Sequence, residues 1–126
     1  MATSVKDMLA AANAAVPRIS AAEVKAMAGD PRVVLVDVRD GAEVKVSGKA
    51  KGALHVSRGL IEFRADPESP LHDAAFDRAK TIVVYCASGG RSALAGKTLK
   101  DMGYGDVRNL GGFKDWVEAG GEVEPG

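Results

Sequence analysis

The sequence predicts an α/β fold, with a mainly parallel central sheet and helices on both of its faces. The chain has 126 residues, of which 46% are hydrophobic, which is enough for one domain with a buried core. Short apolar runs alternate with helix-like segments, as is typical of parallel strands joined by helical crossovers. Two of these runs, residues 33–38 and 81–86, are apolar at successive positions, as expected for strands covered on both faces.

The N-terminal part predicts two helices. Apolar side chains recur at helical spacing in residues 4–16, where Ser4 can cap the first turn and Pro17 ends the pattern. A second, shorter helix is expected in residues 20–29, which open with a serine and a glutamate at capping-box spacing and end in glycine.

The rest of the chain continues the alternation. Glycine, proline and polar residues predict a loop at 46–53 and a turn at 66–70. Further strands are expected at residues 52–57 and 105–110, and further helices at residues 58–66, 70–79, 92–103 and 113–120.

Composition excludes several classes of protein. Lys and Arg together number 17, as do Asp and Glu, so the chain lacks the basic excess of a nucleic-acid-binding protein. One cysteine can form neither an internal disulfide nor a cysteine-based metal site, and it favours a reducing, cytoplasmic location. No apolar run is long enough to span a membrane. An acidic residue interrupts the N-terminal segment, so we expect no secretory leader.

The single cysteine, Cys86, lies where a ligand site is expected. It ends an apolar strand, and ligands of parallel α/β sheets bind beyond the carboxyl ends of the strands. Small residues and two glycines follow, so the backbone can curl and point several N–H groups inward. The next helix adds its unpaired N–H groups and the positive end of its dipole. The predicted anion-binding loop consists of Ala87, Ser88, Gly89, Gly90, Arg91 and Ser92.

The same loop would favour an ionised sulfur. A free cysteine has a pKa of about 8.5 and is largely protonated at neutral pH. N–H donors, a helix N-terminus and the guanidinium of Arg91 all stabilise a thiolate, so Cys86 is the candidate nucleophile. Ser88 and Ser92 have hydroxyls that can donate to a bound sulfur, although Ser92 can equally serve as a helix cap. A buried cysteine with no chemical role is the competing hypothesis.

Three further residues are supporting candidates. Asp37 and Arg39 follow one another closely at the end of the first long strand, where they could line the pocket, or form an ion pair that braces the loop. Arg58 could make the mouth of the pocket basic and attract an anion.

Four motifs in a fixed order identify a related family. They are VDVRD at residues 36–40, KGALHV at 51–56, CASGGRS at 86–92 and NLGGFKDW at 109–116. Together they resemble the rhodanese (sulfurtransferase) family in its single-domain form, over residues 19–123. The helical segment before them has no match in the minimal domain. We therefore divide the chain into an N-terminal helical extension, residues 1–17, and a rhodanese domain, residues 18–126.

The resemblance implies a thiosulfate-type sulfurtransferase. Cys86 would take the outer sulfur from a small anionic donor such as thiosulfate, carry it as a persulfide, and pass it to a thiol or to cyanide. The loop amides would steady the persulfide, and Arg91 would hold the donor or tie the loop down. The family needs no metal or organic cofactor, and a thioredoxin-like protein is a candidate partner.

Loop length separates this chemistry from that of similar enzymes. Four residues lie between Cys86 and Arg91, whereas cysteine phosphatases and the related arsenate reductases have a longer loop around a tetrahedral anion. The shorter loop favours sulfur transfer. Two hypotheses besides the enzyme stay open: a persulfide carrier that turns over thiosulfate poorly, and a binding module that has kept the fold without the chemistry.

Overall fold

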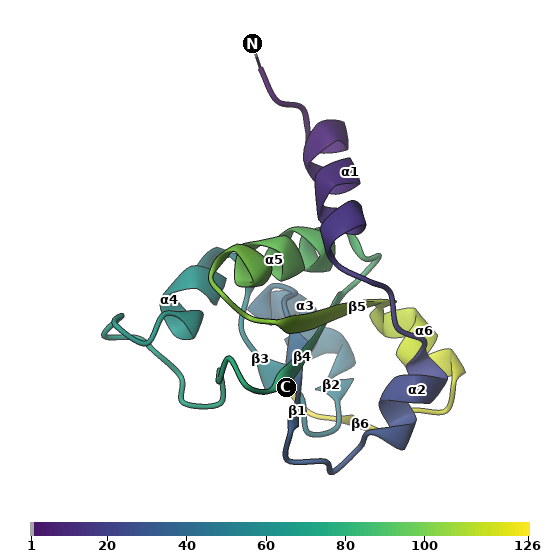
Figure 1. Ribbon diagram of the computed structural model, residues 1–126. Coiled ribbons are helices and arrows are strands. Elements are labelled where there is room, and N and C mark those ends of the chain that lie inside the picture. The colour runs from purple at the N-terminus through teal and green to yellow at the C-terminus, as the bar shows by residue number, and fades with distance from the viewer. Residues whose placement is uncertain (1) are drawn as a thin grey trace.

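Four parallel strands form the centre of the fold. The computed structural model describes residues 2–126 and places the strands in the order β3-β1-β4-β5 (Figure 1). The strands are β1 (Val33–Asp37), β3 (Leu54–His55), β4 (Thr81–Cys86) and β5 (Asp106–Gly112). β4 is buried from its second residue to its last, because layers of helices cover both faces. The predicted α/β class is confirmed.

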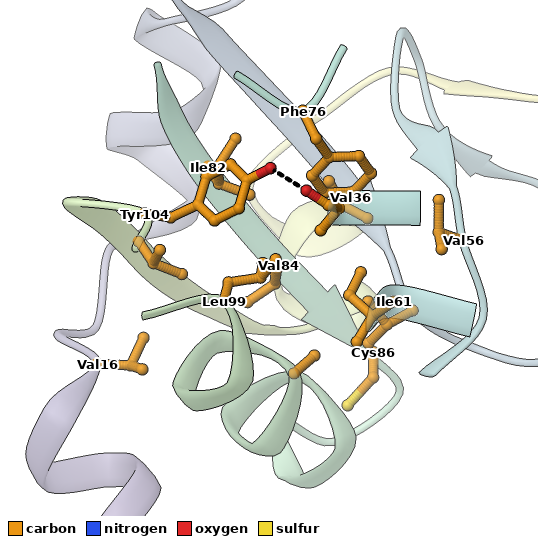
Figure 2. Packing of buried hydrophobic residues seen from close by; sticks show 14 residues of the cluster. Val16, Val36, Val56, Ile61, Phe76, Ile82, Val84, Cys86, Leu99 and Tyr104 are labelled. Carbon is orange, nitrogen blue, oxygen red and sulfur yellow. Dashed lines mark hydrogen bonds between the residues drawn. The ribbon is translucent and has the colours of Figure 1, made fainter. Parts of the chain in front are cut away.

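Each face of the sheet has its own hydrophobic cluster, because alternate side chains of a strand point to opposite faces. On one face, Val84 and Cys86 pack with residues of α5 and α4 (Figure 2). On the other, Val83 and Tyr85 pack with Trp116. The helices are α1 (Val5–Ala15), α2 (Ala21–Ala26), α3 (Gly41–Ser47), α4 (Ile61–Ala65), α5 (Gly90–Asp101) and α6 (Phe113–Glu118), with a short 3-10 helix η1 (Arg58–Leu60) before α4.

The N-terminal helix is part of the packed structure. α1 lies against α5, and Val16, directly after α1, belongs to the same hydrophobic cluster as Cys86. The chain then runs beside β5. The Asn109 amide donates to the Pro17 carbonyl at 2.9 Å, and the Ile19 amide donates to the Asn109 carbonyl at 3.1 Å. These bonds attach the segment between α1 and α2 to the edge of the sheet.

The helix predicted at residues 70–79 is absent, and this prediction was wrong. The segment is a series of turns in which the carboxylates of Asp73 and Asp77 each accept from the amide two residues further on, at 2.9 and 2.8 Å. Such bonds offer the backbone an alternative to the helix. Phe76 anchors the segment, since it is buried in the core and meets the Tyr104 ring edge-on (Figure 2).

Three short elements were not predicted. α3 overlaps the start of the predicted loop at 46–53, and Val44 is its only buried residue, so it has little apolar periodicity. The loop also contains β2 (Lys49–Ala50), which pairs antiparallel with β6 (Val123–Glu124) at the far end of the chain. Such a pairing depends on tertiary contacts that local sequence does not record.

Helix α5 packs in the middle of the larger hydrophobic cluster, so we expect a truncated side chain there to destabilise the protein. Leu99 of α5 is fully buried, so Leu99→Ala should lower the free energy of unfolding by about 2–5 kcal/mol, through lost burial and the cavity left behind. Urea unfolding followed by circular dichroism measures this change. Leu71→Ala is the matched control, because Leu71 is 47% exposed and its loss should change stability by less than about 0.5 kcal/mol. Equal effects would contradict this account of the core.

Candidate active site

The candidate site lies where β4 turns into α5. Cys86 is the last residue of β4, and α5 begins four residues later at Gly90. Gly89 makes the turn with a left-handed φ of 101°. A side chain there would be strained, and its Cβ would lie 3.4 Å from the Cα of Gly111 on the neighbouring strand β5. The glycine therefore allows the loop to curl tightly beneath the start of the helix.

The curled loop directs hydrogen-bond donors at the sulfur. The Gly89 amide donates to Cys86 Sγ at 3.0 Å, and the Ser92 hydroxyl lies 3.5 Å from the same atom. Cys86 is only 1% exposed, and Figure 2 shows its sulfur at the margin of the cluster, close to α5. Ala87 and Ser88 are exposed and form the solvent side of the loop.

Two opposing effects act on the Cys86 thiol. Burial raises its pKa, because a charge is costly in an apolar environment. Hydrogen bonds from the Ser92 hydroxyl, and from the amides of Ser92, Gly89 and Ser88, favour the thiolate and outweigh burial, so the pKa of Cys86 is lowered. The Cys86 sulfur is thus surrounded by hydrogen-bond donors of the loop, although β4, which carries it, packs in the hydrophobic core.

Ser92 does not cap the helix. Gly89 is the N-cap residue of α5, and Ser92 lies fully buried in the first turn. Its hydroxyl donates at 2.8 Å to the side-chain oxygen of Asn109 on β5. Asn109 in turn donates to the Gly89 carbonyl at 3.3 Å. Asn109 was not among the predicted site residues; its place in the NLGGFKDW motif was the signal that could have found it.

Arg91 is bound by acidic side chains at the start of α3. Its guanidinium forms two hydrogen bonds with the carboxylate of Glu43 on α3, one of them 3.0 Å long, and Asp40 lies 3.9 Å from it. The hydrogen bonds from Arg91 lower the pKa of Glu43 to about 2. In this arrangement Arg91 ties the loop to α3. Glu43 was not predicted as a site residue, because the helix that carries it was not recognised.

Asp37 and Arg39 lie on the opposite face of the sheet from Cys86. Asp37 pairs in register with Tyr85, and its carboxylate accepts from the buried Arg39 guanidinium at 2.7 Å. The guanidinium also donates to the Gly48 carbonyl at 2.7 Å and stacks 4.3 Å from the centre of the Phe113 ring. The two residues form a bracing ion pair at the end of α3, and they do not line the sulfur loop.

Arg58 is also outside the loop. Its guanidinium donates to Thr98 in the second half of α5 and to Glu62. It borders a groove of about 320 Å³ that Met8 and Ala11 of α1 line on the other side. The structure therefore brings together Cys86 and residues 87–92, but separates them from the three supporting candidates.

Two further findings bear on the kind of site. Within residues 2–126, His, Cys, Asp and Glu side chains form no group of three or more that could hold a metal ion. In the same part of the chain, every helix is too short or too polar to cross a membrane.

Comparison with known families agrees with this geometry. The sequence profile of the rhodanese-like domain matches residues 20–119, which include the whole cysteine loop and most of both core clusters. The chain belongs to the rhodanese-like family. The predicted family and fold are confirmed, and Cys86 occupies the strand–loop–helix junction of this rhodanese-like domain.

Curated relatives of this rhodanese-like domain include named sulfurtransferases. It is 32% identical over 105 residues to the thiosulfate:glutathione sulfurtransferase of Saccharomyces cerevisiae, a match that covers 74% of this chain and 70% of the relative. It is 36% identical over 89 residues to a sulfurtransferase of Allochromatium vinosum, covering 70% and 75% of the two chains.

Solved structures show the same fold. A protein of unknown function from Rhodopseudomonas palustris, described as a possible tyrosine phosphatase, is 40% identical with a TM-score of 0.89, over 98% of this chain and 96% of the other. The homodimeric polysulfide-sulfur transferase of Wolinella succinogenes is 35% identical with a TM-score of 0.74, over 94% and 85%.

The lowered pKa of the thiol predicts its reactivity. The rate of alkylation by iodoacetamide follows the thiolate fraction, so its midpoint in pH should lie below that of a free cysteine. Cys86 is the only cysteine, so mass spectrometry of the intact protein reports on it alone. The protein unfolded in urea is the control and should titrate as a free thiol. A midpoint in the folded protein at or above that of the unfolded chain would contradict the geometry.

The Arg91–Glu43 pair predicts a dependence of stability on pH. The pKa of Glu43 is about 2 in the folded protein and about 4.3 in an unfolded chain, so the pair stabilises the fold above about pH 4.3. This contribution is lost as the pH falls through the folded-state value. Glu43→Gln should therefore destabilise the protein at pH 7, and the difference from wild type should shrink toward pH 2.

Urea unfolding at a series of pH values measures this difference. Glu118→Gln is a suitable control, because Glu118 lies on the surface of α6 with its partner Lys114 3.7 Å away, and we expect little change at either pH. A Glu43→Gln difference that stays constant with pH would refute the role given to the pair.

Proposed function

We propose that the chain is a sulfurtransferase that transfers the outer sulfur of thiosulfate, or of another anionic sulfane donor, to a thiol or to cyanide. The observation that carries this proposal is the position of Cys86 Sγ, 3.0 Å from a loop amide at the start of a helix. Such a site stabilises a sulfur anion, whether a thiolate or a persulfide. The sulfurtransferase names of the yeast and Allochromatium relatives support it.

The reaction proceeds in two balanced steps. The Cys86 thiolate attacks the outer sulfur of thiosulfate, a sulfur–sulfur bond forms to Cys86, and the bond to the sulfonate group breaks. Sulfite leaves with the electron pair, and Cys86 holds an anionic persulfide. A thiolate or cyanide then attacks the terminal sulfur, and Cys86 leaves as a thiolate. Dividing one transfer into two easier ones is covalent catalysis.

The loop performs the same task in both steps. The negative charge stays on sulfur at the mouth of the loop, first on Cys86 and then on the added atom. The fold fixes the N–H groups of the loop before the sulfur donor binds. They therefore need no reorganisation when negative charge develops on the transferred sulfur. Ala87 and Ser88, directly after Cys86, are exposed, so we expect a small donor to approach the loop from this side.

A second candidate is phosphatase activity, suggested by the description of the Rhodopseudomonas relative. Two features of this chain disfavour it. Only four residues separate Cys86 from Arg91, which leaves less room for a tetrahedral anion above the sulfur. The Arg91 guanidinium is already bound by the Glu43 carboxylate, which leaves it less free to bind a phosphate.

Sulfur loading tests the proposed function. Incubation with thiosulfate should add the mass of one sulfur atom to the intact protein, and cyanide should remove it with release of thiocyanate. Cys86→Ser should show no addition, and Ser69→Ala, which alters a serine in the turns that follow α4, is the control that should load normally. The absence of an adduct with thiosulfate, glutathione persulfide and polysulfide would refute sulfur transfer.

Kinetics separate the enzyme from the carrier and from the phosphatase. Rapid turnover of thiosulfate and cyanide supports the enzyme, whereas ready loading with slow turnover supports a persulfide carrier. Hydrolysis of an aryl phosphate that depends on Cys86, without sulfur loading, would establish the phosphatase instead.

A further inference from the structure

A buried hydrogen-bond chain links the sulfur to strand β5. Ser92 Oγ lies 3.5 Å from Cys86 Sγ and 2.8 Å from Asn109 Oδ1. Ser92 is fully buried, and Cys86 and Asn109 are each 1% exposed. The three polar groups therefore satisfy one another, because buried polar groups need partners within the protein.

The Ser92 hydroxyl has one hydrogen and two neighbouring acceptors, so the protonation state of Cys86 decides which of them receives it. A serine hydroxyl has one hydrogen to donate and lone pairs that accept, whereas a side-chain carbonyl oxygen only accepts. While Cys86 is a thiol, its S–H can donate to Ser92 Oγ, and the Ser92 hydrogen goes to Asn109. Once Cys86 is a thiolate it can only accept, so the Ser92 hydrogen is best placed on the sulfur.

We propose that Asn109 is a positioning residue for Cys86 and acts through the Ser92 hydroxyl, which donates to Asn109 when the sulfur is protonated and to the sulfur when it is ionised. Asn109 keeps a partner in both arrangements, because its Oδ1 also accepts from the Gly111 amide at 2.9 Å. The hydroxyl can therefore turn without leaving a buried acceptor unpaired.

The orientation of the Asn109 amide is fixed by its other contacts. Nδ2 donates to the Gly89 carbonyl at 3.3 Å, while Oδ1 accepts from the Gly111 amide. An amide rotated by half a turn would set its NH₂ group against the Gly111 N–H and its oxygen against the Gly89 carbonyl. The backbone of Asn109 is held as well, since Arg18 Nε donates to its carbonyl at 3.1 Å.

Charged side chains lie around the Cys86–Ser92–Asn109 hydrogen bonds but take no part in them. Arg91 belongs to the same loop and couples electrostatically to Cys86, and the neighbouring contact from α4, Ile61, is apolar. The remaining charged groups near the loop and its flanking glycines are Glu43 and Asp40, which bind Arg91, and Arg18 and Asp115, which lie against Gly111 and Gly112. None of these is altered in the variants below, so their fields stay the same in each comparison.

The test is a double-mutant cycle read on the thiol itself. Ser92→Ala removes the switching hydroxyl and should raise the Cys86 pKa by about one unit, the value of one hydrogen bond to a charged group. Asn109→Asp keeps the shape of the side chain but holds the Ser92 hydrogen more strongly and adds a negative charge, so it should also raise the pKa. In the Ser92→Ala background, Asn109→Asp should raise it less, because the effect through the hydroxyl is gone and only the added charge and the lost hydrogen bond to the Gly89 carbonyl remain.

The pKa values come from the pH dependence of iodoacetamide alkylation, with circular dichroism to confirm that each variant folds. An unchanged pKa in Ser92→Ala, or an equal effect of Asn109→Asp in both backgrounds, would overturn the proposal. If Asn109 had a merely structural role, its effect on the Cys86 pKa would not depend on the Ser92 hydroxyl. Asn109→Asp would then change the pKa equally with and without that hydroxyl.

A second measurement needs no change at Asn109. The infrared S–H stretching band of the single thiol, recorded at a pH where Cys86 is protonated, should shift in Ser92→Ala because its acceptor is lost. An unchanged band would also overturn the proposal. The inference rests on the proposed nucleophilic role of Cys86, yet both readouts are taken without a sulfur donor. A negative result in these two measurements would overturn the role of Asn109 and leave the proposed sulfur transfer standing. A negative result in sulfur loading would overturn sulfur transfer and leave the role of Asn109 standing.

Discussion

The hydrogen bond from the Gly89 amide to the Cys86 sulfur is the contact on which the rest of the site depends. It requires β4 to end at Cys86, Gly89 to adopt a left-handed conformation, and α5 to begin one residue later. It also requires β5 to approach closely, which its glycines allow: a Cβ on Gly112 would lie 2.6 Å from the Ala87 carbonyl oxygen. The site is thus a property of two strands and a helix packed together, and not of the loop alone.

The same helix serves the core and the site. Leu99 and Ala95 of α5 pack against the sheet, while the first turn of α5 supplies Ser92 to the sulfur. Packing therefore fixes the donors before any substrate arrives, and a fixed arrangement of dipoles stabilises charge at little reorganisation cost. The Arg91–Glu43 pair adds a tie from the outer side of the loop to α3. The positive charge of Arg91 is thereby largely balanced, and the Ser92 hydroxyl and the main-chain amides of the loop remain the groups that stabilise an anionic sulfur.

The sequence predicts the strands and the loop well because their signals are local. Continuous apolar runs indicated β1 and β4, and the glycines after Cys86 indicated the turn. The predicted helix at 70–79 failed because aspartate side chains compete for the backbone, and α3 was overlooked because only Val44 is buried. Asn109 lies in a motif that was recognised, but its contact with Ser92 depends on the packing of β5 against α5. Glu43 reaches the loop from α3 and had no such signal in the sequence.

The segment before α2 is hydrogen-bonded to Asn109, and this attachment limits how small an active fragment can be. The family match starts at residue 20, yet the main chain of Asn109 is hydrogen-bonded to Pro17, Arg18 and Ile19, just upstream of that boundary. A version trimmed to the family limits would retain every residue of the cysteine loop while releasing the backbone that orients it from behind. The minimal unit for expression, grafting or fusion therefore has to include the segment at residues 17–19, even though the hydrogen bonds to the sulfur come from Gly89 and Ser92.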